Sequence, residues 1–160
     1  MANSANTKVV SSQIEINASP THVRSVFFDF AAWPTWSKGP GITGISAVVP
    51  RSNDMEIEAG EKIKINLSGT TFKPTVLENT PEQFSWRGGI TGLFHGDHFF
   101  KFLPSKENPG GTTLVNEEVY FGPLVWVIQK VSSTLDNHTG ENYMILNKDF
   151  KARVESLKES

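Results

Sequence analysis

The pattern of apolar and polar positions near the N-terminal end predicts a strand followed by a helix. Residues 9–16, VVSSQIEI, are rich in β-branched side chains, which favour a strand. Ser19 then occupies a helix N-cap position and Pro20 the first helical position. The apolar residues that follow at helical spacing are Val23, Val26, Phe27 and Phe30.

Residues 31–41, AAWPTWSKGPG, contain two prolines and two glycines, so they are too broken for a long element. We expect a helical turn or a short second helix that presents Trp33 and Trp36.

Strand-like segments then follow one another, separated by clusters of Gly, Pro, Asn or Ser. They are residues 42–49, 61–68, 71–79, 83–88, 94–103 and 112–121. Six strands in series predict an antiparallel meander.

The spacing of apolar residues becomes helical after Gly122 and Pro123. A first stripe consists of Leu124, Ile128, Val131 and Leu135. After a break near residues 136–140, a second stripe consists of Tyr143, Leu146, Phe150, Val154 and Leu157. We expect a long or bent helix, with residues 141–157 lying across the concave face of the sheet. A strand, two helices, six strands and a helix together indicate an α+β fold.

Length and composition limit the possible functions. At 160 residues, we expect a flexible N-terminus over residues 1–8 and a single domain over residues 9–158. The net charge is −2 and no block of Lys or Arg occurs, which excludes nucleic acid as an expected partner. The absence of cysteine excludes disulfides, thiolate zinc sites and a cysteine nucleophile. No apolar run approaches the roughly 18 residues of a membrane span, so we expect a cytoplasmic protein.

The order of elements and several strings resemble the START-like superfamily, also called helix-grip or SRPBCC, and its polyketide cyclase/dehydrase and coenzyme-Q-binding branch. The strings are IEINASP running into VFFDFAAWPTW, then FSWRG, LFHGDHFFKF and GGTTLVNEEVYFG. The resemblance implies a curved seven-stranded antiparallel sheet wrapped around a long C-terminal helix, with two short helices after the first strand. It also implies an apolar cavity for a sterol, lipid, polyketide or other apolar molecule. Roles in this superfamily range from transport to cyclisation, and a fold does not choose among them.

Alternation along residues 94–103 separates two faces of that strand. One face carries Phe94, Gly96, His98, Phe100 and Phe102. The other carries His95, Asp97, Phe99, Lys101 and Leu103, and its charges mark it as the solvent face. His98 is therefore expected to point inward and His95 outward.

The facing strand, residues 112–121, has two candidate inward faces. One carries Leu114, Asn116, Glu118 and Tyr120, and the other carries Thr113, Val115, Glu117, Val119 and Phe121. The residues alone leave this choice open, and the resemblance favours the first set.

The hairpin register is a second expectation for these strands. If Phe102 lies opposite Leu114, then His98 lies opposite Glu118, with Cβ atoms about 5 Å apart. A register shifted by two residues pairs His98 with Asn116 instead, and a shift by one is disfavoured.

A histidine held by a carboxylate in an apolar cavity suits general acid–base chemistry, because burial lowers its pKa and the carboxylate raises it. We therefore name His98, Glu118 and Tyr120 as candidate catalytic residues, with Tyr120 as a donor to a carbonyl or enolate oxygen. This set suits enolisation, aldol-type cyclisation or dehydration without a cofactor, as the resemblance implies. A buried pair that only satisfies its own hydrogen bonds, or that only orients a ligand, is the alternative.

The remaining expectations concern the ligand. Side chains expected to contact it are Phe30, Trp33, Trp36, Trp86, Phe94, Phe100, Phe102, Asn116, Tyr143 and Phe150. We expect no metal site, because His95 and His98 point to opposite faces and no second cluster supplies ligands. The leading prediction is binding of one aromatic or polyketide-like molecule, with possible cyclisation, dehydration or isomerisation. A carrier or sensor of a lipid, sterol or quinone is the alternative, and the oligomeric state stays open.

Overall fold

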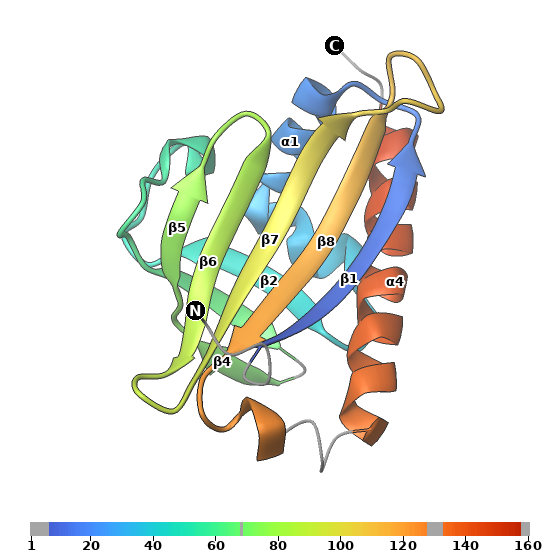
Figure 1. Cartoon of the computed structure of the whole chain (residues 1–160). Helices are drawn as coiled ribbons and strands as arrows, with labels where there is room; N and C mark the ends of the chain where they lie inside the picture. Colours follow the sequence, from blue (N-terminus) through green and yellow to red (C-terminus); the bar gives the residue numbers. More distant parts are fainter. Residues whose placement is uncertain (1–6, 68, 128–132, 158–160) are drawn as a thin grey trace.

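The computed structural model describes residues 7–67, 69–127 and 133–157, with residues 133–138 described as backbone only. The described residues form eight strands, a long C-terminal helix and shorter helical segments (Figure 1). The strands are β1 (Thr7–Ile16), β2 (Ile42–Ala47), β3 (Ile63–Leu67), β4 (Thr70–Phe72), β5 (Thr75–Asn79), β6 (Gln83–Ile90), β7 (Phe94–Pro104) and β8 (Thr112–Phe121). The helices are α1 (Pro20–Phe27), α2 (Trp33–Trp36) and α4 (Ser133–Ser156), with the 3₁₀ turns η2 (Phe30–Ala32) and η3 (Asp54–Glu56).

The strands form two antiparallel sheets. The larger sheet has the order β1-β8-β7-β6-β5, and the smaller has the order β2-β3-β4. Helices α1 and α4 pack on the larger sheet, α4 mainly along β1 and α1 on β7 (Figure 1). This arrangement confirms the α+β helix-grip fold, with short helices after the first strand and a long C-terminal helix on the sheet.

The expected single sheet of seven strands is wrong in one detail, because the predicted strand 71–79 is divided between the two sheets. Pro74 lacks a backbone N–H and therefore cannot continue the hydrogen-bonding ladder. Its carbonyl oxygen accepts a hydrogen bond from the backbone N–H of Ile63, at 3.1 Å. The chain changes sheets here, since β4 before it pairs with β3 and β5 after it pairs with β6.

Helix α4 runs through residues 136–140, so the expected break is not present in its backbone. The predicted stripe is buried from Tyr143 to Val154, but Leu157 follows the last helical residue and is 36% exposed. Of the first stripe, Ile128 and Val131 lie outside the described residues. None of the described helices is long and apolar enough to span a membrane.

An aromatic core fixes the helices on the sheet. Phe27 of α1 contacts seven other aromatic rings, with centroids 4.9 to 6.3 Å away, mostly in edge-to-face geometry. These rings belong to Phe28, Phe30, Trp33, Phe84, Phe100, Phe102 and Phe150. The N-cap also forms as expected, because Ser19 accepts a hydrogen bond from the N–H of His22.

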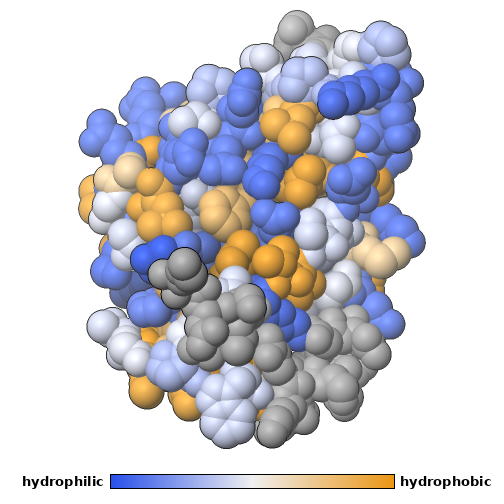
Figure 2. All heavy atoms as spheres, in the orientation of Figure 1, coloured by the Kyte–Doolittle hydropathy of each residue, from blue (hydrophilic) through white to orange (hydrophobic). Residues whose placement is uncertain are grey.

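The outward face of the larger sheet mixes hydrophilic and hydrophobic side chains (Figure 2). Asp97 lies on this face but is only 9% exposed, because Arg87 donates two hydrogen bonds of 2.6 Å to its carboxylate. The expectation that Asp97 marks a solvent-exposed position is therefore corrected. Arg87 also lies over the ring of Phe121, and His95 stacks on the same ring.

Candidate functional site

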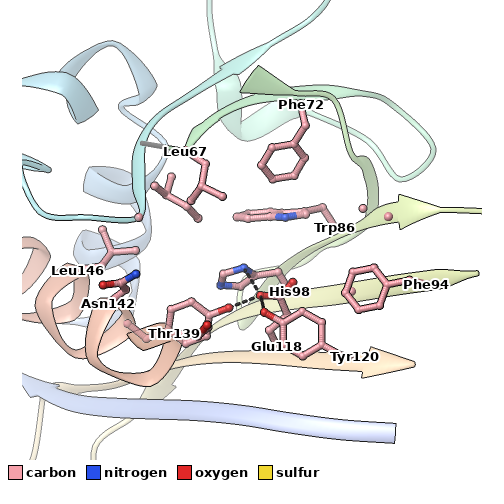
Figure 3. A pocket seen from close by; sticks show the side chains of 16 residues that line it. Leu67, Phe72, Trp86, Phe94, His98, Glu118, Tyr120, Thr139, Asn142 and Leu146 are labelled. Carbon is pink, nitrogen blue, oxygen red and sulfur yellow. Dashed lines mark hydrogen bonds and ion pairs between the residues drawn. The ribbon is translucent and has the colours of Figure 1, made fainter. Parts of the chain in front are cut away.

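A cavity of about 300 Å³ lies between the larger sheet, the smaller sheet and α4. This volume is at the lower end of the range of small-molecule sites. The larger sheet contributes Trp86, Gly88, Gly89, Phe94, Gly96, His98, Glu118 and Tyr120. The smaller sheet and the chain before it contribute Gly41, Ile42, Leu67 and Phe72, and α4 contributes Thr139, Asn142, Tyr143 and Leu146 (Figure 3).

The predicted register of β7 and β8 is confirmed. Phe102 lies opposite Leu114, and His98 lies opposite Glu118. The inward face of β8 is the one with Asn116, Glu118 and Tyr120, and Asn116 is fully buried. Trp86 of β6 lies opposite His98 on the other side, with ring centroids 4.9 Å apart.

Glu118 is the acceptor for two tyrosines at one end of the cavity (Figure 3). The hydroxyl of Tyr120 donates to Oε2 of Glu118 at 2.7 Å, and the hydroxyl of Tyr143 donates to the same oxygen. Nδ1 of His98 lies 3.7 Å from this oxygen, which is ion-pair distance but too long for a hydrogen bond. Two strands and α4 therefore bring four polar side chains together.

A series of hydrogen-bonded polar side chains contacts the other ring nitrogen of His98, Nε2. Nε2 of His98 and Oδ1 of Asn116 are 2.6 Å apart. Asn116 donates from Nδ2 to Oδ1 of Asn147, at 3.2 Å, and Asn147 donates to Oγ of Ser12, at 3.3 Å. The hydrogen bond of His98 thus goes diagonally to Asn116, although the register places Glu118 directly opposite.

Asn147 and Ser12 are residues that the sequence reasoning missed. Asn147 is 1% exposed and lies on α4 four residues after Tyr143, on the same face of the helix. A polar amide inside a stripe of buried apolar residues was the available signal, because buried amides need hydrogen-bond partners.

Burial sets the protonation of these groups. Desolvation lowers the pKa of His98 below its ordinary value of 6.5, although Glu118 and the hydrogen bond to Asn116 oppose this shift. Desolvation and the nearby Glu118 raise the pKa of Tyr120 and of Tyr143 well above 10. At neutral pH His98 is therefore mainly the neutral imidazole, and both tyrosines keep their protons.

Gly96 leaves the space that the carboxylate of Glu118 occupies. A Cβ atom at this position would overlap Oε1 of Glu118 and lie 3.4 Å from the ring of Tyr120. The overlapping atom is the end of a flexible side chain, so a methyl group there would displace the carboxylate more than the backbone.

We therefore expect Gly96→Ala to fold but to lose the arrangement around Glu118. Affinity for a ligand of the cavity should fall at least about tenfold, or about 1.4 kcal/mol. Titration calorimetry beside thermal unfolding checks this. Gly140→Ala on α4 is the control, because its Cβ would meet no atom closer than 4.0 Å. Unchanged affinity in Gly96→Ala would contradict the role given to Gly96.

The expected ligand-contacting residues divide into three groups. Trp86, Phe94 and Tyr143 line the cavity. Asn116 lies behind His98 and is not among the lining residues. The others belong to the packed core: Phe30, Trp33, Trp36, Phe100, Phe102 and Phe150.

Trp33 and Trp36 lie in the core because α2 packs against α4. Their rings are 4.6 Å apart, and Trp36 contacts Phe150 at 5.3 Å. Trp33 also donates from its indole nitrogen to the carbonyl oxygen of Phe27, at 2.8 Å. Both tryptophans are therefore part of the core and are not among the residues that line the cavity.

No group of three or more His, Cys, Asp or Glu side chains converges as a metal site within the part of the chain that the structure describes. His98 points into the cavity, whereas His95 stacks on Phe121, with ring centroids 5.4 Å apart. The expected separation of the two histidines is therefore observed.

Comparison with known proteins gives the family and the fold. The profile of the family described as "Polyketide cyclase / dehydrase and lipid transport" matches residues 7–158. No curated protein sequence matches the chain.

Three solved structures illustrate the fold similarity. A START superfamily protein from Mycobacterium smegmatis is 22% identical, with a TM-score of 0.65 and coverage of 94% of this chain and 99% of that one. The Zhui aromatase/cyclase from a Streptomyces species is 12% identical, with a TM-score of 0.63 and coverage of 93% and 94%. Norcoclaurine synthase from Thalictrum flavum, solved with dopamine and hydroxybenzaldehyde, is 12% identical, with a TM-score of 0.66 and coverage of 96% and 90%.

Structural similarity at identities below 25% establishes a shared fold but does not establish a shared activity. The family match, in contrast, extends over nearly the whole described chain, from β1 to the end of α4. The chain therefore belongs to the polyketide cyclase/dehydrase and lipid transport family.

Proposed function

We propose that the cavity binds one compact, largely apolar, ring-containing molecule and that His98 transfers protons during its cofactor-independent cyclisation, dehydration or isomerisation. The observation that carries this proposal is the convergence of His98, Glu118, Tyr120 and Tyr143 at one end of an otherwise mainly apolar cavity. An apolar pocket with a few convergent polar groups is the usual form of a small-molecule site.

His98 is the group suited to proton transfer. Its neutral imidazole takes a proton from a carbon next to a carbonyl group, and the electron pair forms an enolate. Glu118, 3.7 Å from Nδ1, stabilises the imidazolium that results. The imidazolium then returns the proton to another carbon, which completes an isomerisation, or to a departing hydroxyl, which releases water.

The volume of the cavity supports a compact ligand. About 300 Å³ suits a molecule of a few fused rings better than an extended lipid chain. Trp86, Phe94 and Phe72 present aromatic rings to such a ligand (Figure 3). Flat ring systems stack favourably on such side chains. An aromatic or polyketide-like molecule is therefore the class that the lining favours.

A carrier is the second candidate, because one observation favours it. Both phenol protons are already used by Glu118, and the amide chain behind His98 satisfies its own hydrogen bonds. Such a polar group can hold a ligand in one orientation without reacting. The family description, which includes lipid transport, is consistent with this role.

Ligand binding should change the fluorescence of Trp86, because its buried ring lines the cavity and lies 4.9 Å from the ring of His98. A panel of compact quinones, phenols and aromatic polyketides should include compounds that shift or quench emission. Free ligand at 100 times its dissociation constant should also stabilise the fold by about 2.7 kcal/mol.

The Trp86→Phe variant is the control for this experiment. It should lose the fluorescence change while keeping most of the thermal stabilisation. If no compound in the panel alters either emission or the melting temperature of the unmodified protein, the proposed function is wrong.

A further inference from the structure

We propose that the polar end of the cavity recognises a hydrogen-bond donor on the ligand, either a hydroxyl group or a protonated amine. The inference rests on the proposed function, since it concerns the ligand of the same cavity. It also changes the role expected for Tyr120, which was donation to a carbonyl or enolate oxygen.

The two tyrosines have no free proton. A phenol carries one O–H donor, and the hydroxyls of Tyr120 and Tyr143 both direct theirs to Oε2 of Glu118 (Figure 3). Because both phenols are buried beside a carboxylate, they remain protonated and keep donating to it. A ligand carbonyl therefore finds no phenol donor at this end without breaking one of these bonds.

His98 presents an acceptor to the cavity. Asn116 uses its amide nitrogen for Asn147, so the oxygen of Asn116 faces Nε2 of His98. An amide oxygen accepts hydrogen bonds, which places the imidazole proton on Nε2. Nδ1 is then the unprotonated nitrogen, and it is the nitrogen that faces Glu118.

Glu118 supplies the second acceptor. Its Oε1 lies over Gly96, on the wall of the cavity, and accepts no hydrogen bond from the described residues. The described lining also contains no Lys or Arg that would neutralise the carboxylate. Oε2 is satisfied by the two phenols, but an oxygen without a partner in apolar surroundings is unfavourable, so Oε1 favours a ligand donor.

Nδ1 of His98 and the carboxylate of Glu118 therefore form a site for a donor. Neither acceptor carries a proton, so they do not hydrogen-bond to each other, and Oε2 of the carboxylate lies 3.7 Å from Nδ1. A bound O–H or N–H group can therefore lie between Nδ1 and the carboxylate. The rings of Trp86 and Phe94 beside them favour an ammonium group through their π faces. The side chain of Asn142 on α4 also lines the cavity and has no hydrogen-bond partner among the described residues, so its amide can donate to a carbonyl elsewhere on the ligand.

The test uses four naphthalenes that differ in one substituent: hydroxymethyl, aminomethyl, methoxymethyl or carboxymethyl. Calorimetry should show the hydroxymethyl and aminomethyl compounds binding at least about tenfold tighter than the methoxymethyl ether, which accepts but does not donate. The carboxymethyl compound should bind most weakly, because its charge repels Glu118. Whichever of the hydroxymethyl and aminomethyl compounds binds more tightly identifies the recognised group as a hydroxyl or an ammonium.

Glu118→Gln distinguishes charge from hydrogen bonding. This variant should reduce the affinity of the aminomethyl compound at least about tenfold relative to the hydroxymethyl compound, because only the ammonium depends on the negative charge. The control is Glu117→Gln on the same strand, whose side chain is paired with Lys101 at 3.0 Å on the outward face. It should leave the order of the four affinities unchanged.

Nitrogen NMR of labelled histidine gives an independent readout. It should show His98 with its proton on Nε2 and an unprotonated Nδ1. A proton on Nδ1, or a methoxymethyl or carboxymethyl compound that binds as tightly as the donors, would overturn the inference while leaving the proposed function standing. If none of the four compounds binds, the inference and the binding of compact aromatic ligands fail together.

Discussion

Replacing His98 with alanine should lower turnover by roughly 10²–10⁴-fold, the usual contribution of general acid–base catalysis. The imidazole is the one neutral base among the four polar side chains that converge in the cavity, since the tyrosines hold their protons and donate them to Oε2 of Glu118. Substrate affinity should change much less than turnover. The measurement is a comparison of kcat with KM on the ligand that the fluorescence panel identifies.

The activity should depend on pH through the protonation of His98. Burial lowers the pKa of His98, and the base must be unprotonated to act. Activity should therefore be constant above pH 6.5 and fall only as the pH drops through the lowered pKa. The free energy of unfolding should follow the same direction. It should be highest above pH 6.5 and fall at lower pH, because His98 takes up a proton more readily in the unfolded state than in the folded state.

Two variants serve as controls for His98→Ala. Glu118→Gln should reduce turnover by a smaller factor, because the imidazole remains but loses the charge that stabilises its protonated form. His95→Ala should change turnover little, since that ring stacks on Phe121 on the outward face. Full activity in a His98→Ala protein that still binds substrate would eliminate the histidine mechanism. In a carrier, His98→Ala would weaken binding or lower stability, with no catalytic step to lose.

The inward position of His98 and its register with Glu118 could be predicted from the sequence. Period-two alternation places His98 on the face of Phe100 and Phe102, and a register shifted by one residue would have turned charges inward. The observed pairing of β7 with β8 agrees with this expectation. The side-chain hydrogen bond from His98 to Asn116 was not predictable, because rotamers decide between the opposite and the diagonal partner.

The division between core and cavity was harder to predict. Phe94 and Phe100 lie on the same face of β7, yet Phe94 lines the cavity and Phe100 packs in the aromatic core. Alternation gives the face of a strand but not the position along it at which packing ends. That position depends on where α1 and the smaller sheet meet the larger one, and these contacts join segments distant in sequence. The same reason explains why Leu67 and Phe72 were missed as lining residues.

The largest stability effect should come from Phe27, the ring at the centre of the core. Phe27→Ala should destabilise the fold by about 3–5 kcal/mol, because buried Phe→Ala substitutions lose transfer free energy and leave a cavity. Phe27 is 1% exposed and contacts rings on α2, β7 and α4, so no single neighbour can fill the space. Urea unfolding should show a lower midpoint with a similar slope. The melting temperature should fall by roughly 10 °C for a chain of this size.

The Phe27→Ala substitution should also disturb the polar side chains at the end of the cavity. Phe27 contacts Phe100 of β7 at 4.9 Å and Phe150 of α4 at 6.0 Å, and the ring of Phe100 stacks on His98 at 4.8 Å. Loosening this cluster moves α4, which carries Tyr143, relative to the strand that carries Glu118. Ligand affinity should therefore fall together with stability. The control is Ile90→Ala, whose side chain is 61% exposed and whose loss should change the free energy of unfolding by no more than about 0.5 kcal/mol. Equal destabilisation by the two substitutions, or an unchanged ligand affinity in Phe27→Ala, would contradict the role of this core in holding the site.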